Sequence, residues 1–157
     1  MEARLALEFL QRGLVRNSAG KAFQAWKALL AALLRLEMDK LLQAAKTEEE
    51  KKWLAERAVP RVPTTRMVRL SHMLEEIRHA GVMAWTSVAL DLHDYQYHGP
   101  DPDMALSKYQ TRDEAAKDVI LLVAEIAKRA EALSQRVKWT TELEEALSAL
   151  KEGLRGR

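Results

Sequence analysis

The chain has 157 residues, of which 48% are hydrophobic and 31% charged, so it has enough apolar material for the core of one domain. It contains no cysteine, which excludes disulfides, thiolate nucleophiles and cysteine-ligated zinc or iron–sulfur sites. The formal net charge of +2 is too small for the chain as a whole to attract a polyanion. Lysine or arginine interrupts every apolar stretch well before about 18 residues, so we expect no membrane-spanning segment.

The composition also indicates a cellular setting. A chain without cysteine is typical of the reducing cytoplasm. The first residues carry Glu2 and Glu8 and no small-residue cleavage site, so we expect no secretory signal. Asn17 is the only asparagine among many Glu, Lys and Arg residues, which is typical of thermophilic proteins. We therefore predict a cytoplasmic, thermophilic protein.

Helical periodicity runs through almost the whole chain, because apolar residues recur at helical spacing while Gly and Pro are few. A first helix is expected from Glu2 to Val15. A second is expected from Ala19 to about Ala45, with Ser18 as its N-cap. Because the second helix is apolar on more than one face, it should be a central element with several neighbours.

Three Thr-x-x-Glu sequences predict the starts of later helices, because these two residues at this spacing form a capping box. They begin at Thr47, Thr111 and Thr141. The first opens a short helix around Trp53, and we expect that helix to end before Pro60.

The rest of the chain also divides into helices. Thr64 or Thr65 is expected to cap a helix from Arg66 to Ala80, which Gly81 ends. Three more helices are expected, with a turn-rich loop at residues 97–103: Val82–Tyr95, Arg112–Arg136 and Glu142–Lys151. The sequence thus predicts one all-α domain, an up-down bundle of four to five core helices plus short accessory helices.

Positive charge is concentrated in residues 1–46, which carry eight Lys and Arg against four Asp and Glu. The segment from Gly13 to Lys21 looks like a phosphate loop but lacks the Walker spacing and its Ser or Thr. Arg16, Asn17, Ser18 and Lys21 surround an expected helix N-terminus, which can receive an anion. A plain turn between two helices is the alternative interpretation.

All four histidines and all three tyrosines lie between residues 72 and 109. We expect His93, Tyr95, Tyr97 and His98 to face the same site, where a base stacks on a tyrosine while its phosphate meets the helix start. Hydrogen bonding within the fold is the alternative role for each histidine. The histidine spacing does not suit a metal ion, and we expect neither metal nor cofactor.

Arg66 and His72 form the one pair that looks enzymatic. An arginine that holds a phosphate and a histidine that moves a proton are the minimum for metal-independent cleavage of RNA through the 2′-hydroxyl. Such spacings are common in helices, so two exposed surface residues are the alternative interpretation.

Three segments together resemble the archaeal PaREP family: LVRNSAGKAFQAWKALLAAL, VPTTRMVRLSHMLEE and ALDLHDYQYHGPDPDMALSKYQTRDEAAKDV. The likeness covers residues 3–136, and LHDYQYHGPDP is its most specific part. That family is similar to HEPN domains (higher eukaryotes and prokaryotes nucleotide-binding). The resemblance implies an archaeal homodimer in which each chain is one HEPN-like bundle, with a core at about residues 3–136 and a C-terminal helix at about 142–152.

The resemblance also implies two kinds of function. Some HEPN domains bind nucleotides or a partner protein such as a nucleotidyltransferase; others are toxin-type ribonucleases with an Arg-x4-6-His motif on a late helix. Arg66 and His72 have this spacing but lie on a middle helix, and the expected helix 112–136 has no histidine. We therefore expect a non-catalytic module that binds a nucleotide, another phosphate-bearing ligand or a partner protein. The alternatives are a ribonuclease that uses Arg66 and His72, and a purely structural homodimer.

The tryptophans give a separate argument for assembly. They lie in four different segments, as Trp26, Trp53, Trp85 and Trp139. A bundle of this size buries two or three of them, so the others should leave apolar surface exposed. A symmetric homodimer is the commonest way to cover such a surface, and we predict one.

Overall fold

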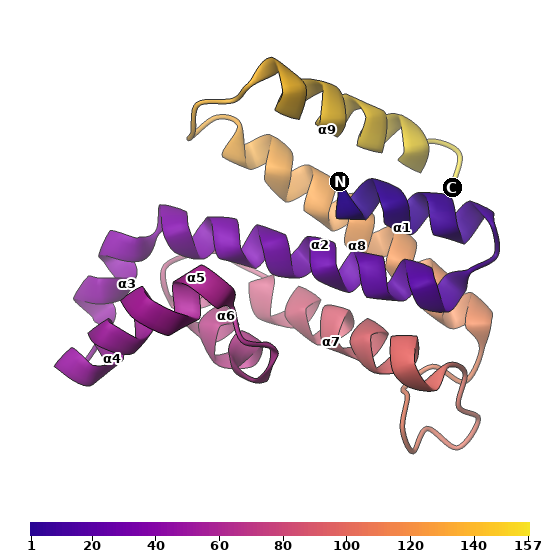
Figure 1. The fold of residues 1–157 in the computed structure, drawn as a ribbon, viewed down its shortest axis with the longest axis horizontal. Helices are drawn as coiled ribbons and strands as arrows, with labels where there is room; N and C mark the ends of the chain where they lie inside the picture. The colour runs from indigo at the N-terminus through magenta and orange to yellow at the C-terminus, as the bar shows by residue number, and fades with distance from the viewer. The chain divides into compact units, whose positions relative to one another are not determined.

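The computed structural model describes all 157 residues and contains only helices and loops, which confirms the predicted all-α class (Figure 1). The chain folds as two compact units, unit 1 with residues 1–26 and 88–157 and unit 2 with residues 27–87. The helices α2 (Val15–Leu36) and α7 (Val82–His98) each contribute residues to both units. No helix has an apolar stretch long enough to cross a bilayer. That the chain forms a single domain stays a prediction.

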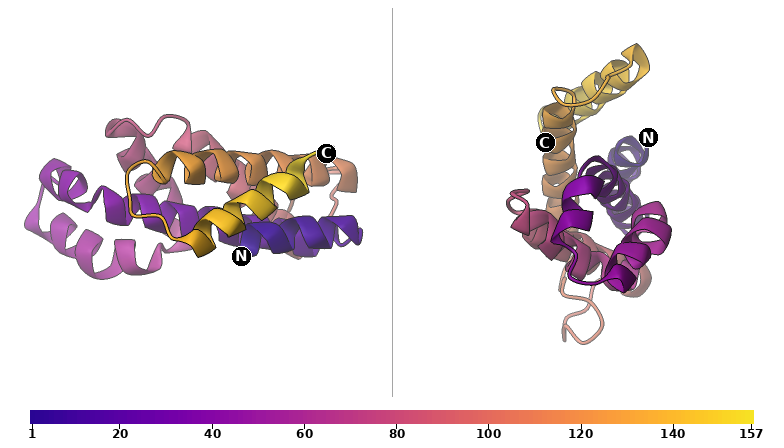
Figure 2. Two further views of the ribbon diagram at one scale, coloured as in Figure 1. Left: turned by 90° about the horizontal axis from the view of Figure 1, so that it is seen from above. Right: turned by 90° about the vertical axis from the view of Figure 1, so that its left-hand side faces the viewer.

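Unit 1 contains α1 (Glu2–Gln11), α8 (Arg112–Leu133) and α9 (Thr141–Leu154), together with its parts of α2 and α7. The helices α1, α8 and α9 contact one another, and Figures 1 and 2 show them in indigo, orange and yellow. Apolar side chains at helical spacing fill the core of this unit: Ala6, Leu7, Phe23, Trp26, Leu92, Val119, Leu122 and Val123.

Unit 2 contains a run of short helices. These are α3 (Met38–Ala44), α4 (Glu48–Trp53), a π-helical turn (Leu54–Ala58), α5 (Val59–Arg61), a 3-10 turn (Thr64–Arg66) and α6 (Met67–Glu76). Their buried side chains join those of the second half of α2: Leu30, Leu34, Leu41, Leu54, Met67, Leu70 and Leu74. The contributions of these elements to the core are unequal: α4 and the 3-10 turn bury no side chain, whereas α6 buries Met67, Leu70, Ser71 and Leu74.

The boundaries of the first two helices differ from the prediction. α1 ends at Gln11 instead of Val15, because Gly13 has a φ of 73°, which suits glycine and turns the chain. α2 begins at Val15, so Ser18 lies inside the helix and is not its N-cap. Its hydroxyl donates to the carbonyl oxygen of Ala6 at 2.6 Å.

The long second helix is interrupted at Glu37, so the expected helix to Ala45 is divided into α2 and α3. The Glu37 side chain is only 2% exposed. Its carboxylate lies 2.9 Å from His79 Nε2 and 3.0 Å from Lys40 Nζ. These contacts compensate for the cost of burying a carboxylate where the helix breaks.

Two of the predicted caps on later helices have different outcomes. Thr111 and Glu114 form the reciprocal capping box as predicted, and α8 begins there. The cap of α9 is Thr140 rather than Thr141, and its hydroxyl accepts from the amide of Leu143 at 3.2 Å. The error is one residue, because two adjacent threonines offer the same chemistry.

The prediction that the helix ends before Pro60 is wrong. The chain stays helical to Arg61 by widening into a π-helical turn at Leu54–Ala58, directly before the proline. Proline lacks an amide hydrogen and clashes with the carbonyl four residues earlier in an α-helix, and a wider turn relieves that clash. The helix then stops at Val62, whose φ is 42°.

The helix expected from Arg66 to Ala80 is shorter than predicted. α6 ends at Glu76, and Arg78 adopts the left-handed conformation expected for Gly81, with a φ of 77°. The amide of His79 donates to the carbonyl of Leu74 at 3.0 Å, which closes the helix end. Neither Thr64 nor Thr65 caps α6, because both lie in the preceding 3-10 turn.

The connection from α7 to α8 is a loop organised by one carboxylate. Asp101 accepts from the amides of Leu106 at 2.6 Å, Ser107 at 3.2 Å and Asp103 at 3.2 Å. These amides, above all that of Leu106, hold the pKa of Asp101 below its usual range. Tyr109 fixes the far end of the loop, since its hydroxyl donates to Asp118 at 2.6 Å.

Candidate functional site

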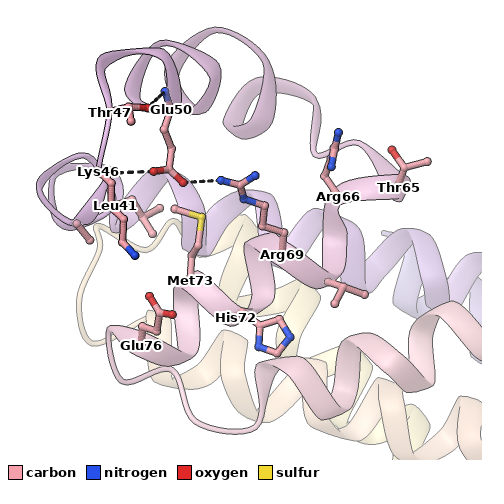
Figure 3. Close-up of a pocket in the computed structure, with 12 residues that line it drawn as sticks. Leu41, Lys46, Thr47, Glu50, Thr65, Arg66, Arg69, His72, Met73 and Glu76 are labelled. Carbon is pink, nitrogen blue, oxygen red and sulfur yellow. Dashed lines mark hydrogen bonds and ion pairs between the residues drawn. The ribbon is translucent and has the colours of Figure 1, made fainter.

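Unit 2 contains an open cavity of about 740 Å³ where α6 faces the connection between α3 and α4 (Figure 3). Ligand sites for small molecules have about 300–1,000 Å³, so this volume is sufficient for one. The lining side chains include several charged groups: Leu41, Ala44, Lys46, Thr47, Glu50, Thr65, Arg66, Val68, Arg69, His72, Met73 and Glu76.

The sequence of α6 separates the core from the cavity. Met67, Leu70 and Leu74 follow one another at spacings of three and four residues and are buried. Arg69, His72, Met73 and Glu76 follow the same spacings on another face and line the cavity. One amphipathic helix therefore supplies both the packing of unit 2 and a wall of the cavity.

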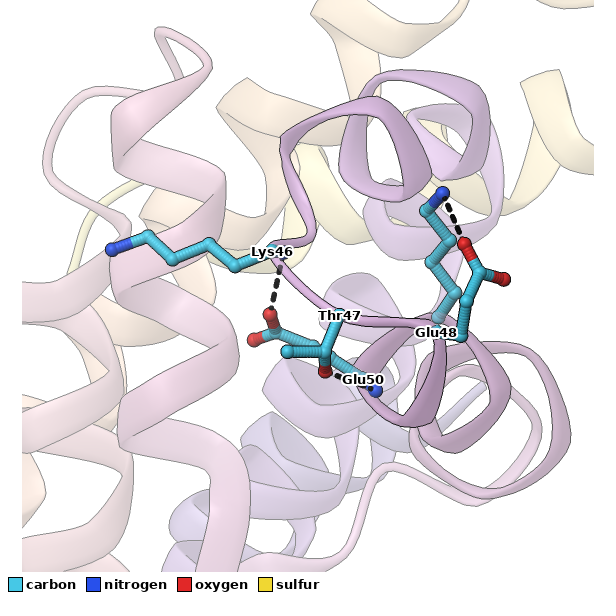
Figure 4. Close-up of polar contacts among 5 residues, drawn as sticks. Lys46, Thr47, Glu48 and Glu50 are labelled. Atoms are coloured by element: carbon cyan, nitrogen blue, oxygen red, sulfur yellow. Dashed lines mark hydrogen bonds and ion pairs between the residues drawn. The ribbon is translucent and has the colours of Figure 1, made fainter.

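The opposite wall is positioned by the N-cap of α4. The Thr47 hydroxyl accepts from the amide of Glu50 at 3.1 Å, as predicted (Figure 4). The Glu50 carboxylate does not return to Thr47; it accepts from the amide of Lys46 at 3.0 Å. It also forms an ion pair with Arg69 at 2.6 Å (Figure 3). The amide of Lys46 and then Arg69 lower the pKa of Glu50, so this carboxylate stays ionised.

Three basic side chains of the cavity remain without a hydrogen-bond or ion-pair partner. They are Lys46, Arg66 and His72, all exposed on the cavity walls. Arg69 differs because Glu50 neutralises its charge. The available positive charge therefore comes from two elements, the α3–α4 connection and the start of α6.

A second hollow of about 300 Å³ shares Thr47, Glu50, Arg66 and Arg69 with the cavity. Trp53 forms part of its wall, and the Arg69 guanidinium lies 5.3 Å from the centre of the Trp53 ring. Arg66 and Arg69 line both hollows. An aromatic surface therefore lies next to the cationic cavity.

The structure brings the predicted pair Arg66 and His72 into this one cavity, although the two side chains do not contact each other. Sequence reasoning missed Lys46, Glu50 and Arg69. The spacing of Arg66, Arg69 and His72 at every third residue was a signal for a shared side of the helix. No pattern in the neighbouring sequence predicts that Lys46 lies across the cavity from Arg66, Arg69 and His72.

The other predicted site residues lie in unit 1. Arg16 donates from Nε to the carbonyl of Gln96 at 3.0 Å and from Nη2 to that of Tyr97. The His93 ring stacks on Phe23 with centroids 4.2 Å apart, and Tyr97 meets His93 edge-on at 5.2 Å. The structure thus brings the start of α2 and the end of α7 together. That they form a ligand site stays a prediction.

Several members of that predicted set point elsewhere. Ser18 is buried with its hydroxyl on Ala6, and its amide already donates to the carbonyl of Leu14 at 2.9 Å. Lys21 forms an ion pair with Glu2 at 2.8 Å. His98 is exposed at the last residue of α7. Arg16, Asn17 and Tyr95 line a hollow of about 250 Å³ in this unit.

No group of three or more His, Cys, Asp or Glu side chains lies close enough together to hold a metal ion. The fold and the cavity together define an all-helical protein with a cavity lined by basic side chains. The chain belongs to the archaeal PaREP1/PaREP8 family, whose model matches residues 1–120. No match is found among curated proteins or among solved structures. The similarity to HEPN domains stays a prediction.

Proposed function

We propose that the chain binds a phosphate-bearing ligand such as a nucleotide in the cavity of unit 2. The observation that supports this function is the set of three unpaired basic side chains, Lys46, Arg66 and His72, around about 740 Å³ of open space. A phosphate can accept charge-assisted hydrogen bonds from Lys46 and Arg66 and a further hydrogen bond from His72. The volume is larger than a bare phosphate needs, which favours a ligand with an attached organic part.

Each wall has a role in this proposal. The Arg66 guanidinium can hold two phosphate oxygens at once, whereas the Lys46 ammonium supplies a point charge from the opposite side. Glu50 keeps Arg69 beside Trp53, and the aromatic wall there can stack a nucleobase. The neighbouring hollow thus offers a place for the base of a nucleotide whose phosphate binds in the cavity.

Arg66→Gln should weaken the binding of ATP, GTP or AMP about tenfold or more. A hydrogen bond to a charged group contributes about 1.5–3 kcal/mol, and about 1.4 kcal/mol corresponds to a factor of ten. Isothermal titration calorimetry measures the change. Arg61→Gln is the matched control, since Arg61 is an exposed arginine of the same unit that does not line the cavity. Absence of heat for every nucleotide at millimolar concentration would contradict the proposal.

The presence of Arg66 and His72 in one cavity favours metal-independent cleavage of RNA as a second candidate function. In this reaction His72 takes the proton from the 2′-hydroxyl, whose oxygen attacks the adjacent phosphorus while the bond from phosphorus to the 5′-oxygen breaks. Arg66 stabilises the negative charge that develops on the phosphate, and the departing 5′-oxygen takes a proton from water. The two functions share the phosphate contact and differ in the proton transfer.

If binding is the function, structured and single-stranded RNA should stay intact when incubated with the protein and a metal chelator. Gel electrophoresis of the RNA is the measurement. Cleavage that is lost in His72→Ala and kept in His98→Ala would establish the second candidate instead. His98 is a suitable control because it is an exposed histidine outside the cavity.

We also propose that the chain forms a homodimer. Trp26 is fully buried, whereas Trp53, Trp85 and Trp139 are half-buried. Other large apolar side chains are exposed: Leu14, Val68, Tyr97, Met104, Leu106, Leu121, Val137 and Leu143. A two-fold interface of about 1,500 Å² would cover part of this surface, and a partner protein such as a nucleotidyltransferase is the other candidate to cover it.

Light scattering at micromolar concentration should therefore give twice the chain mass of 17.8 kDa. The same mass is expected from size-exclusion chromatography at several loading concentrations. A mass of one chain that does not change with concentration would mean that the exposed apolar side chains do not form an interface between copies.

A further inference from the structure

We infer that unit 1 carries a separate binding site for a small organic anion, in the hollow beside Tyr95. This hollow has a volume of about 250 Å³. Its walls combine the apolar side chains of Leu14, Val15 and Pro100 with the guanidinium groups of Arg16 and Arg112. The inference does not depend on the cavity of unit 2, because the two sites share no residue.

Tyr95 contributes a polar group to the lining of the hollow. Its side chain is only 1% exposed, and its ring is held edge-on against Tyr109 with centroids 5.7 Å apart. The hydroxyl forms no hydrogen bond within the chain, and its oxygen is not among the fully buried unpartnered atoms, so it is accessible from the hollow. Burial raises the pKa of Tyr95, so the phenol stays protonated and can donate to a ligand.

Arg16 and Arg112 supply the positive charge. Arg16 is held in place by the carbonyls of Gln96 and Tyr97, which use only its Nε and Nη2 groups. Its Nη1 group forms no hydrogen bond within the chain. Arg112 is the first residue of α8, and its guanidinium has no ion-pair partner. Arg16, Arg112 and Tyr95 all line the same hollow.

The contribution of Arg16 to folding is compatible with ligand binding. By donating to carbonyls at the end of α7, it stabilises that helix terminus. The same contacts restrain its side chain before a ligand arrives, which lowers the entropy lost on binding. The contacts that hold Arg16 against the end of α7 thus also prepare its guanidinium group for a ligand in this hollow.

The size and walls of the hollow define the ligand class. A volume of about 250 Å³ is below the range typical of drug-sized ligands, which excludes a fully enclosed nucleotide. Two guanidinium groups and a phenol hydroxyl suit an oxyanion head, either carboxylate or phosphate. The wall formed by Leu14, Val15 and Pro100 suits a short apolar body.

Benzoate and phenyl phosphate are suitable probes, because they present the two heads on the same apolar body, and benzamide is their neutral counterpart. NMR titration of the full chain should show saturable shifts of the amides of residues 14–17 and 112 with at least one of the two anions. Benzamide should cause no such shifts. Whichever anion binds identifies the head group, and binding of both identifies a general oxyanion site.

Tyr95→Phe and Arg112→Gln should each weaken this binding about tenfold or more. Tyr95→Phe retains the ring and its contact with Tyr109, so the fold should be preserved, and thermal melting checks this. Tyr97→Phe is the matched control, since that side chain is 62% exposed. Arg61→Gln, at an exposed arginine that lines neither site, should leave benzoate and phenyl phosphate binding unchanged. Absence of shifts with both anions would overturn the inference. So would variants Tyr95→Phe and Arg112→Gln that both bind the anions as tightly as the wild type.

Discussion

Leu70→Ala should lower the free energy of unfolding by about 2–5 kcal/mol, whereas His72→Ala should change it by no more than about 0.5 kcal/mol. Both residues lie on α6, only two positions apart. Leu70 is fully buried in unit 2, and truncating it removes apolar contacts and leaves a hole. His72 is exposed on the cavity face of the same helix. Urea unfolding followed by circular dichroism measures both values.

This pair of variants also supports the binding and cleavage tests. If His72→Ala is as stable as the wild type, a change in cleavage reports a lost chemical group and not a damaged fold. Similar losses of stability in Leu70→Ala and His72→Ala would show that the cavity face of α6 is part of the core. The separation of core and cavity on this helix would then be wrong.

Features that depend on nearby residues could be predicted from the sequence. The capping box of Thr111 and Glu114 needs only two residues of one turn, and it formed as predicted. The all-α class was predictable for a similar reason, because helical periodicity is a property of short windows. The Thr47 cap was predicted, but its glutamate accepts from Lys46 instead of closing the box.

Features that depend on distant residues could not be predicted. The break at Glu37 is stabilised by His79, which lies 42 residues further along the chain. Arg78 adopts the left-handed conformation that ends α6, although glycine is normally preferred there, and Gly81 adopts a positive φ of 80° only three residues later. Pro60 remains in a helix because the preceding turn widens. In each case the local preference was weaker than the packing of the unit.

The candidate site divides in the same way. Arg66 and His72 were recognised because their spacing within one segment suggested a pair. Lys46 was not, because its position opposite them depends on how the α3–α4 connection packs. Ser18 was expected to contact a ligand at the helix start, but α2 begins at Val15, three residues before Ser18. The Ser18 hydroxyl donates instead to the carbonyl oxygen of Ala6. A polar residue near a helix start is therefore a weak predictor until the start itself is known.

Trp26→Ala should lower the free energy of unfolding by about 3–5 kcal/mol, the usual cost of removing a buried aromatic side chain. Trp26 is fully buried in unit 1, and the guanidinium of Arg129 lies 5.8 Å from the centre of its ring. The variant therefore loses a large apolar surface and a cation–π contact. Trp139→Ala is the matched control, since Trp139 is only half-buried and its truncation should cost less.

Trp26→Ala and Leu70→Ala together test whether the two units unfold as one domain. α2 and α7 contribute residues to both units, so the unfolding of one unit removes parts of helices on which the other depends. We therefore expect a single cooperative transition, seen at the same urea concentration by circular dichroism and by tryptophan fluorescence. Each variant should move this whole transition to lower urea. Two transitions, of which Trp26→Ala moves one and Leu70→Ala the other, would instead show that residues 27–87 fold as an independent domain.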